Sequence, residues 1–160
     1  MSSFTIRSAV PEDTGLILSF IRKLAAYENM LDDVVADIDT LRRTLFEQRY
    51  AESIIGEEDG VPVGFALFFH NFSTFLGRPG IHLEDIFVDP SARGKGYGKA
   101  LLAHVASIAV ERGCQRLEWA CLDWNTPSQE FYESFGAIPL NEWIVYRLTG
   151  SPLQDLANLR

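Results

Sequence analysis

The chain has 160 residues, enough for a substantial buried core, and we predict one continuous domain over residues 1–160. Hydrophobic residues make up 47% and charged residues 22%, which is the balance of a soluble globular protein. The formal charge of -8 disfavours nucleic acid and anionic membranes as partners; it suits a cationic small molecule, although simple solubility explains it too.

The N-terminal quarter predicts one strand and two helices. Residues 4–8 alternate between apolar and polar side chains, as a strand does. Pro11 and the acids after it open a helix, whose apolar stripe ends near Tyr27 and Glu28. A shorter helix is expected over residues 39–48.

The middle of the chain predicts three strands. Strands at residues 52–56 and 61–69 flank an Asp59-Gly60 turn, which is a hairpin signal. Two glycines and a proline in residues 72–80 indicate an irregular loop, and a strand over residues 81–88 follows.

A long helix follows the glycine-rich residues 93–98 and stops at Gly113. After it we expect a strand at residues 117–122, a helix from Asn125 to Phe135 and a strand at residues 143–148. The order of elements predicts a mixed sheet with helices on both faces.

The glycine-rich turn favours a phosphate ligand, because glycines allow close approach and a helix N-terminus offers unpaired N–H groups. A Walker A loop is excluded, since Arg93 stands at its first glycine and Ala100 at its Ser/Thr position. A dinucleotide fingerprint is excluded, because its third glycine falls on Lys99 or Leu101. An Arg-x-x-Gly-x-Gly pattern remains.

This pattern resembles the pyrophosphate-binding motif of the GNAT acetyltransferases. Asn125 before a helix that carries Ser128 and Tyr132 on one face resembles their second cofactor motif. The resemblance implies acetyl-CoA as co-substrate and a twisted, mostly antiparallel mixed sheet of six to seven strands with about four helices. It implies these cofactor-binding residues: Ile86, Phe87, Val88, Arg93, Gly94, Lys95, Gly96, Tyr97, Gly98, Lys99, Asn125, Ser128 and Tyr132.

Four segments resemble the spermidine/spermine and thialysine N-acetyltransferase branch: residues 24–28, 83–88, 93–98 and 122–125. This implies a small aliphatic amine as acceptor, either a diamine or polyamine or a thialysine-like amine, and a homodimer. The substrate-binding residues that it implies are Tyr27, Glu28, Glu84, Asp85 and Glu118.

A direct-transfer mechanism follows from these roles. An alkylammonium has a pKa near ~10.4 if it behaves like Lys, so a base must take its proton, and the resemblance supports Glu84. Asp85 would face the opposite side of a regular strand, but the family has a bulge here. Backbone N–H groups of Ile86 and Val88 would bond the cofactor, and Tyr132 would protonate the leaving thiolate.

Several alternatives stay open. Tyr132 could be a packing residue, His82 a hydrogen-bonded sheet histidine, and Cys121 an acyl carrier, although no base is placed near it. The acceptor could be a protein amine or an aminoglycoside, and the chain could be a non-catalytic acyl-CoA sensor. Two cysteines without metal spacing indicate no metal site. The absence of a signal peptide or a long apolar run predicts a cytoplasmic protein.

Overall fold

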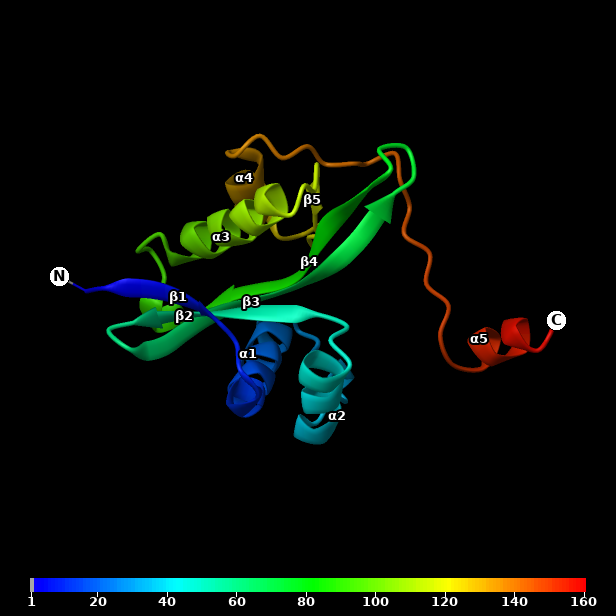
Figure 1. The fold of residues 1–160 in the computed structure, drawn as a ribbon, viewed down its shortest axis with the longest axis horizontal. Coiled ribbons are helices and arrows are strands. Elements are labelled where there is room, and N and C mark those ends of the chain that lie inside the picture. The colour runs from blue at the N-terminus through cyan, green and yellow to red at the C-terminus, as the bar shows by residue number, and fades with distance from the viewer. Residues whose placement is uncertain (1) are drawn as a thin grey trace. The chain divides into compact units, whose positions relative to one another are not determined.

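The computed structural model describes residues 2–160 as two compact units, one ending at Ala120 and the other formed by Cys121–Arg160. The first unit holds a five-stranded sheet in the order β1-β2-β3-β4-β5 (Figure 1). Strands β1 to β4 pair antiparallel with one another, and β5 runs parallel to β4. The predicted mixed, mostly antiparallel sheet is therefore confirmed. Its strands are β1 Phe4–Ser8, β2 Glu52–Glu58, β3 Val61–Ser73, β4 Arg78–Val88 and β5 Leu117–Glu118.

Helices cover both faces of this sheet, as predicted. Helices α1 and α2 lie on one face and α3 on the other (Figure 1). None of the helices in the described residues is long and apolar enough to span a bilayer. The α-helices are α1 Thr14–Tyr27, α2 Ile38–Arg42, α3 Tyr97–Glu111, α4 Thr126–Glu133 and α5 Gly150–Ala157. The short turns are η1 Pro11–Asp13, η2 Leu31–Asp33, the π-turn η3 Arg43–Glu47 and η4 Pro90–Ala92.

Aromatic side chains form the core between α1 and the sheet. Phe20 of α1 stacks on Phe65 of β3 with ring centroids 5.3 Å apart, and Phe87 of β4 lies 6.1 Å away. All three are at most 5% exposed. Burial of such a side chain contributes about 1.5–3 kcal/mol, so these contacts fix the end of β4 against α1.

Residues 72–80, which we predicted as an irregular loop, are mostly strand. Strands β3 and β4 continue to a short turn, with Asn71 opposite Gly80 and Phe72 opposite Pro79. A Cβ at Gly80 would meet Asn71 Oδ1 at 2.5 Å. Gly80 therefore leaves room for the Asn71 side chain, and its glycine was wrongly interpreted as a loop signal.

One expected strand is shortened and another, at residues 143–148, is absent, so the described residues hold five strands rather than six or seven. Strand β5 stops at Glu118 instead of residue 122. Its pairing with β4 ends at His82, two residues before Glu84, the extra residue of a bulge in β4. Residues 143–148 have strand propensity but are not a strand, since propensity alone does not form one.

Candidate active site

A β-bulge on β4 brings two carboxylates to one face of the sheet. Leu67 lies opposite Asp85 and Phe68 lies opposite Leu83, so Glu84 has no residue opposite it. The extra residue breaks the alternation of a regular strand, as the resemblance implied.

The orientation of Glu84 follows from its contact with His82. The Glu84 carboxylate lies 3.5 Å from His82 Nε2, and His82 shares the α1 face with Leu67 and Asp85. Glu84 is 55% exposed, whereas Asp85 is half-buried. The base candidate therefore faces solvent beside a more buried acid.

Asp85 belongs to a cluster of three acids, which we name the acidic corner: Glu28, Glu84 and Asp85. Burial, and then the charges of Glu84 and Glu28, raise the pKa of Asp85 to about 6. Burial also raises the pKa of Glu28 at the end of α1. Acids that are desolvated and close together attract a cation, because its charge relieves their mutual repulsion.

We expect Asp85→Asn to stabilise the fold at neutral pH. The folded-state pKa lies above the unfolded value, so the ionised carboxyl destabilises the folded state above about pH 6, and this cost disappears below about pH 4. The variant should raise the free energy of unfolding by about 1–3 kcal/mol at pH 7.5. Urea unfolding at pH 7.5 and pH 4 tests this, and an equal difference at both values would contradict it.

The other predicted acceptor residues already have partners in the protein. Glu118 accepts a hydrogen bond from Asn71 at 3.1 Å and pairs with Arg116 at 3.3 Å. The Tyr27 ring lies 5.4 Å from the Arg93 guanidinium. Glu118 is therefore already engaged by Arg116 and Asn71, and Glu28 is the better candidate for holding a cation.

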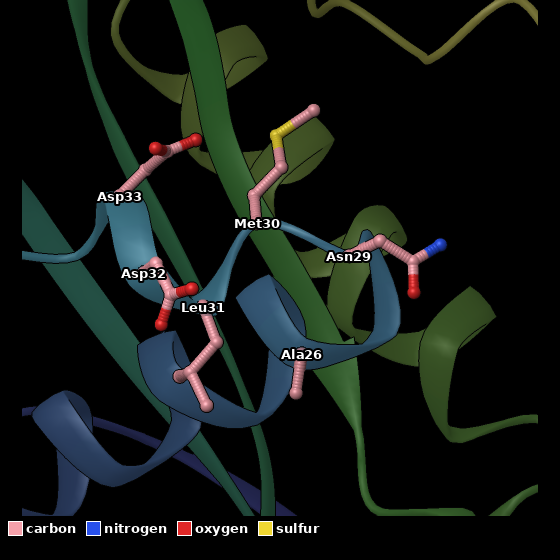
Figure 2. Close-up of a pocket in the computed structure, with 6 residues that line it drawn as sticks. All are labelled: Ala26, Asn29, Met30, Leu31, Asp32 and Asp33. Carbon is pink, nitrogen blue, oxygen red and sulfur yellow. The ribbon is translucent and has the colours of Figure 1, made fainter.

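A shallow pocket follows Glu28, and our sequence analysis missed it. Asn29, at a φ of 60°, follows the C-cap of α1, and the chain then turns into η2. Figure 2 shows Asp32 and Asp33 as its acidic members. The adjacent aspartates were the available sequence signal. The lining residues are Ala26, Asn29, Met30, Leu31, Asp32 and Asp33.

The glycine-rich turn leads into α3 with the backbone conformation that only glycine adopts easily. Gly94 and Gly96 have φ values of 80° and 83°. Gly96 caps α3, so the first N–H groups of the helix lack partners within the helix. A Cβ at Gly94 or Gly96 would meet nothing within 4 Å, so both glycines border open space.

Several predicted cofactor residues have side chains that are buried or already engaged in hydrogen bonds within the protein. The Phe87 side chain is 5% exposed in the core. Tyr97 is buried, stacks on Phe4 at 4.0 Å and donates to the Glu58 carboxylate. Arg93 Nε–H donates to the Val88 carbonyl at 2.9 Å.

The edge of β4 next to this turn is open. Strand β5 pairs with β4 only at Ile81 and His82, so residues 83–88 have no strand on that side in the part of the chain the structure describes. Ile86 and Val88 lie within this stretch. The arrangement combines an unpaired strand edge with a helix N-terminus, and it suits a ligand that carries both amides and phosphates.

We expect Gly96→Val to weaken CoA binding at least tenfold, which corresponds to about 1.4 kcal/mol. A Val side chain would fill the open space beside the turn and would strain a backbone at φ 83°. Gly77→Val is the control, because Gly77 also has a positive φ and open space but lies in the β3–β4 turn. Calorimetry that shows equal CoA affinity for folded Gly96→Val and wild type would contradict this placement.

The second unit carries the remaining predicted residues on α4. Asn125 is buried, and its Oδ1 accepts from the Ser128 N–H at 3.4 Å, as an N-cap does. Ser128 and Tyr132 are one turn apart on the helix and half-buried. Cys121 Sγ lies 3.6 Å from the Leu122 carbonyl, which is a contact within its own loop. Among the described residues no three His, Cys, Asp or Glu side chains group as metal ligands.

Comparison with known proteins agrees with this geometry. The model of the Acetyltransferase (GNAT) family matches residues 23–137, from within α1 to just past α4. The chain belongs to the GNAT acetyltransferase family. Within that family it is 37% identical to the thialysine N-epsilon-acetyltransferase of Sus scrofa and 36% to that of Bos taurus, over 98% of this chain and 99% of each relative. This GNAT protein is therefore an N-acetyltransferase, and the predicted branch is confirmed.

Solved structures show the same fold. An integron cassette protein from the Vibrio cholerae mobile metagenome is 31% identical, with a TM-score of 0.81 over 98% of both chains. An aminoglycoside N-acetyltransferase in complex with CoA is 25% identical, with a TM-score of 0.73 over 92% of this chain and 96% of that one. The GNAT fold predicted from the sequence is confirmed.

Proposed function

We propose that this GNAT enzyme transfers the acetyl group of acetyl-CoA to a small aliphatic amine with a second positive charge, such as a diamine or a thialysine-like amine. The acidic corner carries the proposal, because three neighbouring acids beside an open strand edge suit a dication. The names of the pig and cattle relatives support it. An L-ornithine N5-acetyltransferase of Arabidopsis thaliana, 46% identical over 63% of this chain and 44% of its own length, supports a charged alkylamine.

Glu84 is the proposed proton acceptor for the attacking amine. At neutral pH almost all of an alkylamine is protonated, so the base must act directly or through one water. Glu84 is 55% exposed at the bulge, with its carboxylate 3.5 Å from His82 Nε2, so a substrate can reach it. Glu28 and Asp85, which are more buried, then hold the second ammonium group.

The backbone of β4 and the glycine turn would hold acetyl-CoA, which supplies an activated acetyl thioester when bound. The N–H groups of Ile86 and Val88 lie on the stretch of β4 with one open edge, and one of them would stabilise the oxyanion. Tyr132 would donate its proton to the leaving thiolate, whose acid has a pKa near ~8.5 if it resembles free Cys. The acetyl group would then pass directly to the amine in a ternary complex.

A homodimer is part of this proposal. The second unit contains an apolar run, Trp143, Ile144, Val145 and Tyr146, and such a run is normally covered by other protein surface. A second copy of the chain would bury it. Light scattering that gives a monomer mass at micromolar concentration would contradict this part. The cytoplasmic location and the single domain stay predictions.

A panel of amines with acetyl-CoA, followed by release of free thiol, tests the proposed function. Diaminopropane and thialysine should give rapid turnover, while a lysine-containing peptide and an aminoglycoside should give little. Turnover with the peptide or the aminoglycoside alone would favour the alternative acceptors. Binding of CoA without turnover of any amine would indicate an acyl-CoA sensor.

A further inference from the structure

Glu58 contacts the glycine-rich turn at two points. It ends β2, and its carboxylate accepts hydrogen bonds from Lys95 Nζ at 2.9 and 3.2 Å and from the Tyr97 hydroxyl. The Tyr97 bond, and then the Lys95 bond, hold the pKa of Glu58 below its usual value, so Glu58 is an anion at neutral pH. The contact also raises the pKa of Tyr97 to about 12.

This position is unfavourable for a turn that binds phosphate. The Glu58 carboxylate beside the turn repels a pyrophosphate group. It also forms an ion pair with the ammonium group of Lys95, which lies in the turn itself. Lys95 stands between Gly94 and Gly96, whose open sides form the candidate phosphate site. The charge of Lys95 is thus neutralised by the protein at the site where an anion would need it.

The two contacts of Glu58 differ in how firmly the partner side chain is held in place: Tyr97 is packed in the protein, whereas Lys95 is exposed. Tyr97 is buried and stacked on Phe4, so its hydroxyl stays next to Glu58. The Lys95 side chain is 44% exposed on a flexible stem, and exposed ion pairs of this kind contribute little to stability. Lys95 can therefore leave Glu58 at small cost while Tyr97 keeps the carboxylate in place.

We propose that Glu58 sets the strength of cofactor binding by competing with the pyrophosphate of CoA for Lys95. The inference rests on the proposed function, in that it takes CoA to bind at residues 94–98. Without CoA, Lys95 pairs with Glu58; with CoA bound, it pairs with the pyrophosphate. Glu58 is then a residue that weakens donor affinity and speeds product release.

Calorimetric titration of CoA into four proteins tests this competition: wild type, Glu58→Gln, Lys95→Gln and the double variant. Glu58→Gln keeps an oxygen that can accept the Tyr97 hydrogen bond and removes only the charge. It should bind CoA about threefold to tenfold more tightly, and Lys95→Gln should bind it more weakly by a similar factor. In the Lys95→Gln background the gain from Glu58→Gln should shrink, since the competition is gone.

Two controls separate this effect from general changes in charge or folding. Glu57→Gln makes the same charge change one residue away, at a carboxylate that contacts Arg7 at 3.4 Å rather than the turn, and should leave CoA affinity unchanged. Pantetheine lacks the pyrophosphate, so its affinity should be the same in wild type and Glu58→Gln.

Three results would overturn the inference: unchanged or weaker CoA binding in Glu58→Gln, an equal gain in Glu57→Gln, or an equal gain for pantetheine. The first and second would show that Glu58 does not compete for Lys95. The third would show that the effect does not involve the pyrophosphate. A wild-type protein that binds no CoA would instead contradict the proposed function itself.

Discussion

Tyr132→Phe should lower kcat about 100- to 1,000-fold and leave CoA affinity within a factor of two. A departing thiolate needs a proton, and the proposed donor is the Tyr132 hydroxyl on α4. Phe keeps the ring, and with it the 5.5 Å contact to Phe131, so packing should be preserved. Steady-state kinetics at saturating amine, with calorimetry for CoA, measures both quantities.

Tyr50→Phe is the matched control for this experiment. It also removes a phenol hydroxyl, but Tyr50 is 72% exposed and lies between η3 and β2, outside the predicted site residues. Its kcat should equal that of wild type. If Tyr132→Phe retains turnover within a factor of three, Tyr132 is a packing residue and the thiolate leaves without its help.

The enzyme should prefer diaminopropane over propylamine by about tenfold to 100-fold in kcat/KM. The acidic corner would meet the second ammonium group in a partly desolvated position. At an effective dielectric of about 20, one contact at ~4 Å contributes on the order of 4 kcal/mol before desolvation, which cancels much of it. The preference should fall as salt rises, because part of the attraction is screened.

Two glutamate variants distinguish the acids that hold the substrate. Glu28→Gln should reduce the preference for the diamine while leaving propylamine turnover nearly unchanged. Glu118→Gln should have a smaller effect, because Arg116 and Asn71 already engage that carboxylate. Equal kcat/KM for the two amines at every salt concentration would rule out the acidic corner as the basis of specificity, and a protein amine would become the leading acceptor.

The parts of the fold that follow from local patterns could be predicted. The apolar stripes of α1 and α3 appear at helical spacing, and the Asp59-Gly60 turn has the positive φ values that its sequence indicates. Gly80 was wrongly predicted to lie in a loop. It lies in a strand, where the absence of a side chain leaves room for Asn71 of the neighbouring strand. The strand predicted at residues 143–148 was wrong because pairing depends on a partner edge, which residue propensity does not supply.

The candidate site was predictable as a set of residue types and less so as an arrangement. The glycine positions and the N-cap Asn125 follow from backbone requirements that the sequence displays. The shared face of Glu84 and Asp85 depends on a bulge, which derives from the register against β3. The pairing of Lys95 with Glu58 joins residues 37 positions apart, and no local pattern indicates it.

The most direct test of the proposed activity is to identify the product formed from acetyl-CoA and diaminopropane by the purified protein. Mass spectrometry and a thiol assay on the same samples would follow both products over time. We expect monoacetylated diaminopropane and free CoA in equal amounts, with formation slowed about 100- to 1,000-fold in Tyr132→Phe. Release of CoA without acetylated amine, or acetyl groups found only on protein lysines, would contradict it.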